Sequence, residues 1–250
     1  MINLKRKNRI IHIYIISAIL IIALSTVFFI MYKYNIEGER NLPFNITKLI
    51  VISSAETENF EKQESIYQAD VIQKNDIYIA IEKNQNYKKT DAIKEITFNN
   101  FKILEQSKIG KLNFYRTTAE GTKTFEYTEN YLINNEIKYI GGKETNLQEE
   151  QMTIANQGGL IKISATIEDL GKLTYTENEN ITSDGRLLNK LNLKSEDIKT
   201  KISFDVIMKL SSGNTFKTTI TLDLPTGDIV NEGVSTTENN NLEKLVFKRV

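Results

Sequence analysis

The chain has 250 residues, and its 32 Lys and Arg balance 32 Asp and Glu, so the formal net charge at pH 7 is zero. It has no Cys, which excludes disulfides, thiol catalysis and zinc sites built on thiolates. Hydrophobic residues make up 40 % and charged residues 26 %, a composition typical of chains that fold around a core. The balanced charge provides no electrostatic footprint for nucleic acid, so we expect no nucleic-acid partner.

The most informative stretch is an apolar run over residues 10–32, which contains no Asp, Glu, Lys or Arg. As a helix of 23 residues it would be about 34 Å long, enough to cross a hydrocarbon core of roughly 30 Å. The preceding residues 1–9 carry four basic side chains, which the positive-inside bias keeps in the cytoplasm. We therefore predict a transmembrane signal-anchor helix over Ile10 to Tyr32. The N-terminus would be cytoplasmic and the rest of the chain extracytoplasmic at the cell membrane.

The alternative for this run is a cleaved signal peptide. The apolar region of a signal peptide spans about 7–15 residues and ends at an A-x-A-like site, whereas this run is longer and ends VFFIMY. The single histidine of the chain, His12, lies within the run near its basic end. The predicted ectodomain therefore has no histidine for acid–base or triad chemistry. Beyond residue 32, residues 33–44 read as a short stalk, in which Gly38 and Pro43 interrupt the helix.

The sequence after the stalk favours β-strands because its apolar residues recur with a period of two. In residues 76–84, Ile77, Ile79 and Ile81 share one face, and Tyr78 and Ala80 share the other, which indicates a central buried strand. In the first half we expect strands at residues 47–55, 76–84, 93–104, 111–118, 123–129 and 135–140. The polar stretches 56–65 and 83–91 predict loops.

The second half has clearer alternation. Residues 160–168 place isoleucines inward and Lys162, Ser164 and Thr166 outward, and residues 202–210 and 215–225 form the strongest hairpin. Residues 183–201 have some helical character, and residues 242–250 predict a final strand. The charged stretch between Gly142 and Gln151 is the best candidate for a boundary between lobes at 45–147 and 148–250. The fold class is mainly β: one transmembrane helix, then an antiparallel β-sandwich-like ectodomain, possibly of two lobes.

Few residues point to chemistry, and we assign no catalytic, cofactor-binding or metal-binding residue and no cofactor. Ser53 and Ser54 follow the first strand, so a Ser–Lys hydrolase is an alternative, although the Ser-Met-x-Pro context of signal peptidases is absent. No acidic stretch has the spacing of a calcium loop, and turns and strands separate Asp169, Asp184 and Asp205, so the sequence does not assign them a shared site. A calcium site elsewhere on the surface of a β-sandwich stays open.

Several strings carry a resemblance: LPF (42–44), NDIYIAIEKN (75–84), SDGRLL (183–188), ISFDVIMKL (202–210) and TLDLP (221–225). With the basic head and single anchor, the chain resembles an uncharacterised group of single-pass membrane-anchored proteins with β-rich ectodomains from AT-rich Gram-positive bacteria. The resemblance covers nearly the whole chain and implies topology and location only.

Together these patterns predict a membrane-anchored extracytoplasmic protein that is a non-catalytic binding or scaffolding module at the cell envelope. Its partners would be the lipid bilayer, contacted by Ile10 to Tyr32, and an envelope protein or wall polymer. The two alternatives are a membrane-tethered hydrolase using Ser–Lys or carboxylate chemistry, and a signalling or assembly subunit of an envelope complex.

Overall fold

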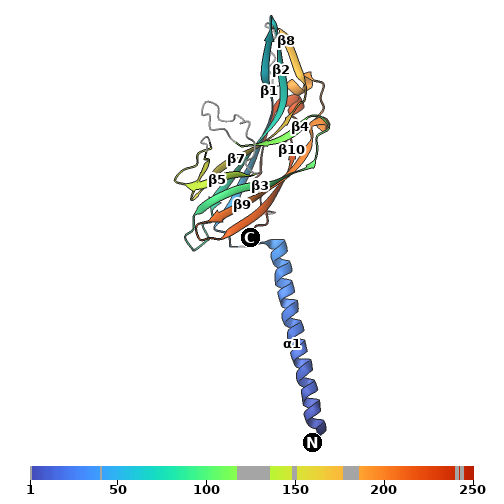
Figure 1. Cartoon of the computed structure of the whole chain (residues 1–250), viewed down its shortest axis with the longest axis vertical. Coiled ribbons are helices and arrows are strands. Elements are labelled where there is room, and N and C mark those ends of the chain that lie inside the picture. The colour runs from blue at the N-terminus through green and yellow to red at the C-terminus, as the bar shows by residue number, and fades with distance from the viewer. Residues whose placement is uncertain are drawn as a thin grey trace.

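The computed structural model describes residues 2–39, 41–116, 136–147, 151–176, 186–239, 242 and 245–250, with the backbone alone for residues 2–11. It consists of one long helix, α1 (Ile2–Glu37), and a β-rich body (Figure 1). The helix takes in the predicted basic tail and the first residues of the predicted stalk. Its part from His12 to Glu37 is long and apolar enough to cross a membrane, and nothing in the body buries it. A membrane anchor and a signal sequence share this character.

The body is a sandwich of two sheets, and it confirms the mainly β, sandwich-like prediction. One sheet, which we call sheet A, has the order β11-β1-β2-β7-β4, with β8 also paired to β2. The other, sheet B, has the order β12-β10-β9-β3-β5-β6. The strands of sheet A are β1 (Phe44–Gln63), β2 (Ile66–Lys83), β4 (Lys111–Tyr115), β7 (Gly158–Glu168), β8 (Lys172–Thr176) and β11 (Val234–Asn239). Those of sheet B are β3 (Ile93–Glu105), β5 (Ile137–Gly142), β6 (Thr153–Ala155), β9 (Thr200–Leu210), β10 (Thr215–Leu224) and β12 (Lys248–Arg249).

Among the described residues, every strand pair is antiparallel except that of β5 with β6. Both sheets take strands from both sides of the predicted boundary between residues 147 and 148. The division into lobes therefore does not correspond to the division into sheets.

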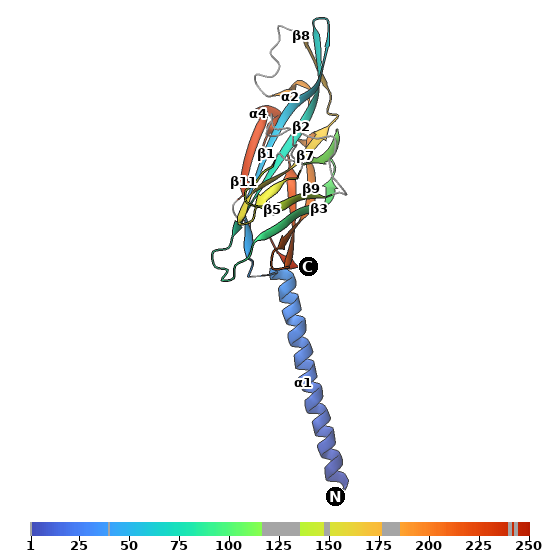
Figure 2. The ribbon, with the colours of Figure 1, turned by 60° about the vertical axis from the view of Figure 1, so that its left-hand side comes forward.

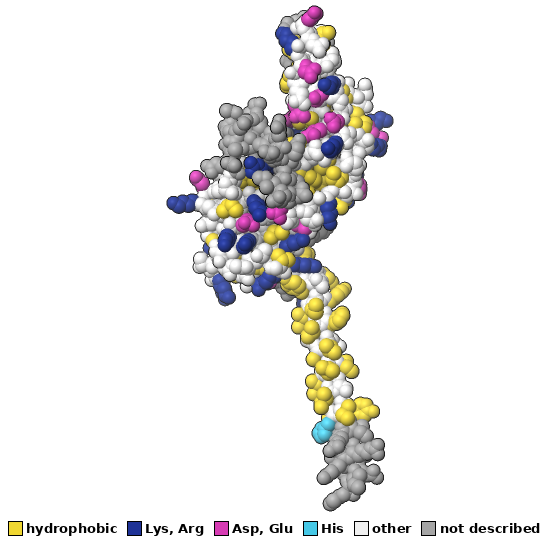
Figure 3. Space-filling view, in the orientation of Figure 1, with side chains coloured by type: hydrophobic (Ala, Val, Ile, Leu, Met, Phe, Trp, Pro, Cys, Tyr) yellow, Lys and Arg dark blue, Asp and Glu magenta, His cyan; other side chains and the backbone are white. Residues whose placement is uncertain are grey.

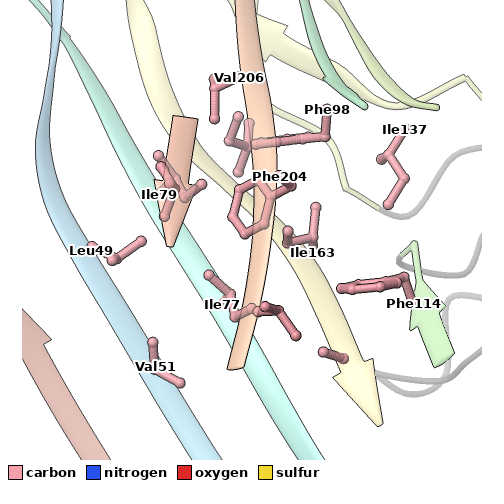
Figure 4. Packing of buried hydrophobic residues seen from close by; sticks show 14 of the residues in the cluster. Leu49, Val51, Ile77, Ile79, Phe98, Phe114, Ile137, Ile163, Phe204 and Val206 are labelled. Atoms are coloured by element: carbon pink, nitrogen blue, oxygen red, sulfur yellow. The ribbon is translucent and has the colours of Figure 1, made fainter. Parts of the chain in front are cut away.

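The core lies between the sheets and is lined by the alternating apolar residues of each strand (Figure 4). Ile77 and Ile79 of β2 face Phe204 of β9, as the period-two pattern predicts. The rings of Phe98 and Phe204 pack edge to face, with their centroids 5.9 Å apart. Edge-to-face contacts of this kind add to the free energy gained from burial alone.

Three short helices, α2 (Leu187–Lys190), α3 (Ser195–Ile198) and α4 (Ile229–Glu232), connect strands. Residues 186–198 therefore confirm the helical character expected within 183–201. Among the described residues of the predicted last strand, 242–250, only Lys248–Arg249 form one. The predicted strand over 123–129 lies outside the described residues.

The polar stretch 56–65, for which the sequence predicts a loop, instead belongs to β1 and its turn. β1 and β2 pair from Phe44 with Lys83 to Gln63 with Ile66, so their hairpin continues beyond the sandwich. Cross-strand backbone hydrogen bonds stabilise this extension where there is no apolar pattern to predict it. Figures 1 and 2 show the extension at the end of the body opposite α1.

Candidate functional site

The part of the body farthest from α1 is a three-stranded ribbon, which we call the arm: residues 56–70 of the β1–β2 hairpin together with β8. β8 pairs with β2 from Ile66 opposite Thr176 to Asp70 opposite Lys172. The arm is held by backbone pairing and by contacts between its own side chains. Its side chains are mostly exposed or half-buried.

The arm exposes aromatic and apolar side chains. Phe60 has 58 % of its surface exposed and Ile66 has 46 %. Tyr67 and Tyr175 stack across β2 and β8 with ring centroids 5.3 Å apart, and the Lys62 ammonium lies 4.9 Å from the Tyr67 centroid. Exposed aromatic side chains are enriched where proteins bind one another.

Two outer strand edges of the arm have no strand paired to them among the residues that the structure describes. β11 pairs with β1 only from Leu49 to Ser54. Next to this pairing, the Ala55 N–H donates a hydrogen bond to the Gly233 carbonyl. Within the described part of the chain, no strand pairs with the outer edge of β1 over residues 56–63, or with that of β8. An open edge presents N–H and C=O groups to which another extended chain can add.

The charge of the arm is negative. Residues 56–70 include five acidic side chains and one basic one, and β8 adds Lys172, which lies 3.5 Å from Asp70. Acidic side chains are spread along this end of the molecule in Figure 3. At its base, burial raises the pKa of Glu58, and the neighbouring carboxylate of Glu168 raises it further. Burial likewise raises the pKa of Glu168. A positively charged group placed beside these carboxylates would relieve their repulsion.

A second polar group lies on the face of sheet A that points away from sheet B; we call Lys162, Asp76, Ser164, Lys74 and Glu56 the outer-face cluster. The Lys162 Nζ lies 2.9 Å from Asp76 Oδ1, to which the Ser164 hydroxyl also donates at 2.6 Å. Lys74 lies 3.5 Å from Glu56 Oε2 and 3.9 Å from Asp76 Oδ2. Lys162, Ser164 and Asp76 are buried, with Lys162 only 1 % exposed.

Sequence reasoning missed this cluster. The alternation in β7 correctly directs Lys162 and Ser164 away from the apolar core, but both are buried there. The one signal in the sequence is the charged pair Lys74 and Asp76, which stands in a strand otherwise rich in isoleucine. Its neighbours on β7 are set by strand register, since Asp76 lies opposite Ser164 and Tyr78 lies opposite Lys162.

The serines considered for a Ser–Lys hydrolase donate their hydrogen bonds to groups other than lysine, although Ser54 lies opposite Lys74 in the pairing of β1 with β2. The Ser53 hydroxyl is buried and donates to Asn75 Oδ1 at 2.7 Å while accepting from the Thr226 N–H at 2.9 Å. Ser54 donates to Glu56 Oε1 at 2.9 Å. The structure therefore gives Ser53 a place in a hydrogen-bond network that joins β1, β2 and the turn after β10.

The aspartates considered for calcium are not brought together. Asp205 of β9 bonds Lys217, Asn100 and Thr219, while Asp169 lies after β7 in sheet A. Asp184 lies outside the described residues. Among the residues that the structure describes, no group of three or more His, Cys, Asp or Glu is placed to hold a metal ion.

Comparison with known proteins adds no family assignment: no protein-family model matches the chain, and no curated protein matches it significantly.

Proposed function

We propose that this chain is a membrane-anchored extracytoplasmic binding or scaffolding module without catalytic activity, and that the arm is its binding surface. The observation that carries the proposal is the combination of exposed Phe60 and Ile66 with open strand edges at the end farthest from α1. A helix anchored in the membrane would present this end to partners in the envelope. The anchor itself is supported by the length and apolar character of residues 12–37.

The simplest mode of binding is strand addition. An extended segment of the partner would pair with the free edge of β1 over residues 56–63, and its side chains would contact Phe60. Backbone hydrogen bonds would supply affinity, and the side chains would supply specificity. Because the arm is acidic, the partner segment is expected to be basic and to belong to another envelope protein.

Two features argue against the Ser–Lys form of the hydrolase alternative. Ser164, on the same strand as the buried Lys162, donates its hydrogen bond to Asp76 and is 2 % exposed. Ser54 lies opposite the buried Lys74, but its hydroxyl donates to Glu56. Ser53 is fully buried within its own network. A hydrolytic serine must reach both a general base and the substrate, and neither Ser164 nor Ser53 is accessible to a substrate.

The orientation can be tested directly because the chain contains no Cys. Single cysteines are introduced at Ser212, in the turn between β9 and β10, and at Asn3, ahead of the apolar run. A membrane-impermeant maleimide applied to intact cells should label position 212, and position 3 only after lysis. Labelling of position 3 in intact cells, or protection of position 212, would contradict the proposed topology.

The binding surface is tested by placing a photo-crosslinking residue at Phe60 in the cells that make the protein. Leu160, which is 41 % exposed on β7, is the matched control position. We expect a discrete protein adduct at position 60 and none at position 160. Reversing the charge of the arm with Glu58→Lys and Glu61→Lys should abolish the adduct, whereas Glu196→Lys on α3 should not. An adduct that survives the arm reversal, or equal adducts at both positions, would refute the arm as the binding surface.

The junction between α1 and the body favours a second candidate, a signalling or assembly subunit. The Tyr34 hydroxyl accepts a hydrogen bond from the Arg249 N–H at 2.7 Å, and the Glu39 N–H donates to the Phe247 carbonyl at 2.7 Å. Arg249 also pairs with Glu39 at 3.3 Å. These contacts couple the end of the helix to β12, so that a helix movement would reach the sandwich. If a scrambled apolar anchor of equal length preserves function, this second candidate fails.

A further inference from the structure

The outer-face cluster brings an amine and a carboxyl group into contact in a buried site. Lys162 and Asp76 lie diagonally across the neighbouring strands β7 and β2, a separation that a long side chain can span. Lys162 Nζ is 2.9 Å from Asp76 Oδ1. The amine nitrogen therefore lies beside the carboxyl group whose carbon it would attack, and reacting groups held together in a fixed geometry gain a large effective concentration.

The surroundings raise the fraction of Lys162 amine that is uncharged. Burial lowers the pKa of the Lys162 ammonium to about 8, although the Asp76 carboxylate opposes this change. At pH 7 about a tenth of such amines are unprotonated, against a negligible fraction for an exposed lysine. A buried ion pair also carries a desolvation penalty for both charges, which a neutral product would remove.

We propose that Lys162 and Asp76 condense to an intramolecular amide bond that joins β7 to β2. A proton first passes from the Lys162 ammonium to the Asp76 carboxylate, leaving a neutral amine and a carboxylic acid. The amine lone pair then attacks Asp76 Cγ, forming the C–N bond. The C–O bond breaks, and the oxygen leaves as water with one of the nitrogen's protons. The reaction needs no oxidant, cofactor or other protein.

The neighbours of the pair stabilise this reaction. The Ser164 hydroxyl donates to Oδ1 at 2.6 Å, so it supports negative charge that develops on that oxygen in the tetrahedral intermediate. The Lys74 ammonium, 3.9 Å from Oδ2, adds positive charge on the other side, and Glu56 holds Lys74 at 3.5 Å. Because the site is buried, it limits the water that would drive the reverse hydrolysis.

A second ion pair in the molecule provides the matched comparison. Lys217 Nζ lies 2.7 Å from Asp205 Oδ2, a contact at least as close as that of Lys162 with Asp76. The Lys217 side chain is 39 % exposed, however, so water reaches this pair and favours hydrolysis over condensation. We expect no amide there.

The amide would reinforce the strand that leads to the arm. β2 is a central strand of sheet A, and its residues 66–70 form the middle strand of the arm. A covalent link from β2 to β7 within the sandwich would resist separation of these strands when a bound partner pulls on the arm.

The test is the mass of the full-length chain, purified in detergent and measured intact after denaturation. We expect a deficit of about 18 Da relative to the sequence, one molecule of water. Trypsin should release a branched fragment in which residues 75–83 are joined to residues 144–172 through Asp76 and an uncleaved Lys162. The deficit and the branched fragment should vanish in Lys162→Arg and in Asp76→Ala, and persist in Lys217→Arg.

The measurement on the unaltered chain decides the proposal even if the variants fold poorly. A full sequence mass for that chain overturns it. So does a deficit located in a linear fragment, as a cyclic imide would give, or a branched fragment that joins other residues.

Discussion

The Tyr139 hydroxyl on β5 of sheet B bonds both backbone groups of Lys162 on β7 of sheet A. It donates to the Lys162 carbonyl and accepts from the Lys162 N–H at 3.2 Å. β4 pairs with β7 from Lys111 opposite Glu168 to Tyr115 opposite Ser164, and the Tyr139 hydroxyl bonds β7 two residues beyond this pairing. A side chain of sheet B thus forms hydrogen bonds with the backbone N–H and C=O of a strand in sheet A.

Replacing Tyr139 by Phe should therefore weaken the sandwich. Two buried backbone groups would lose this partner, and we expect the free energy of unfolding to fall by about 2–3 kcal/mol. Urea denaturation followed by circular dichroism measures this change. Tyr175→Phe, on the half-buried stacked tyrosine of the arm, is the control and should change stability by less than about 0.5 kcal/mol. Equal losses in the two variants would rule out the bridging role of Tyr139.

Ser53→Ala should destabilise the protein through its hydrogen-bond network. The Thr226 N–H and Asn75 Oδ1 would each lose a partner, which is expected to lower the free energy of unfolding by about 1–2 kcal/mol. Ser54→Ala is the neighbouring control and should have a smaller effect, since its bond to Glu56 is only partly buried. Denaturation curves of the two variants make the comparison, and a larger loss for Ser54→Ala would contradict it.

Gly38→Ala should disrupt the junction between α1 and the body. Gly38 has φ +68°, and a Cβ there would lie 2.3 Å from the Phe247 carbonyl oxygen. Gly213→Ala is the control, because its φ of +86° brings the same backbone strain, but no heavy atom lies within 4 Å of the added Cβ. Limited trypsin digestion should cut the segment between α1 and β1 faster in Gly38→Ala alone. If both variants are cut at the same rate, backbone strain and not the contact with Phe247 is responsible.

The pH dependence of stability should report on Asp205. Burial would raise the pKa of its carboxyl, but hydrogen bonds from Lys217, Thr219 and Asn100 outweigh it and hold the pKa below the usual value. A carboxyl whose pKa is depressed by folding stabilises the protein above its unfolded pKa, about 3.9, and loses this effect as the pH falls through the folded pKa.

Asp205→Asn should therefore lower the free energy of unfolding by about 2 kcal/mol at pH 7, and by progressively less below about pH 4. Urea denaturation between pH 7 and pH 3 measures the difference between the unaltered chain and the variant. Asp223→Asn is the control, because that side chain is 65 % exposed and its contact with Lys201 is screened by water. A difference that does not change with pH would show that the Asp205 charge is not the stabilising feature.

Glu58→Gln should raise the free energy of unfolding at pH 7, whereas Asp205→Asn lowers it. Burial and the nearby Glu168 raise the pKa of Glu58, so the folded state binds its proton more tightly than the unfolded state does. Stability then falls as the pH rises from the unfolded pKa through the folded one. The variant should be more stable than the unaltered chain at pH 7, by less than about 1 kcal/mol because the site is half-exposed, and equal to it near pH 3. Thermal denaturation at both pH values checks this, and a less stable variant at pH 7 would refute it.

The spacing of apolar residues correctly predicts the apolar helix and the strands whose apolar residues alternate. The uninterrupted apolar run from Ile10 to Tyr32 became one helix, and Gly38 ends it as expected. The alternation of Ile77 and Ile79 correctly placed β2 in the core, because burial of one face is encoded locally. Polar residues 56–63 carry no such pattern, so their strand was missed.

The spacing of apolar side chains therefore specifies the apolar helix and the two-faced strands that must cover one another. The continuation of β1 and β2 into the arm depends on tertiary pairing, because cross-strand hydrogen bonds are independent of side-chain type. Tertiary pairing also brings Lys162 and Asp76 together. Their contact depends on the register between β2 and β7, two strands that are far apart in the chain.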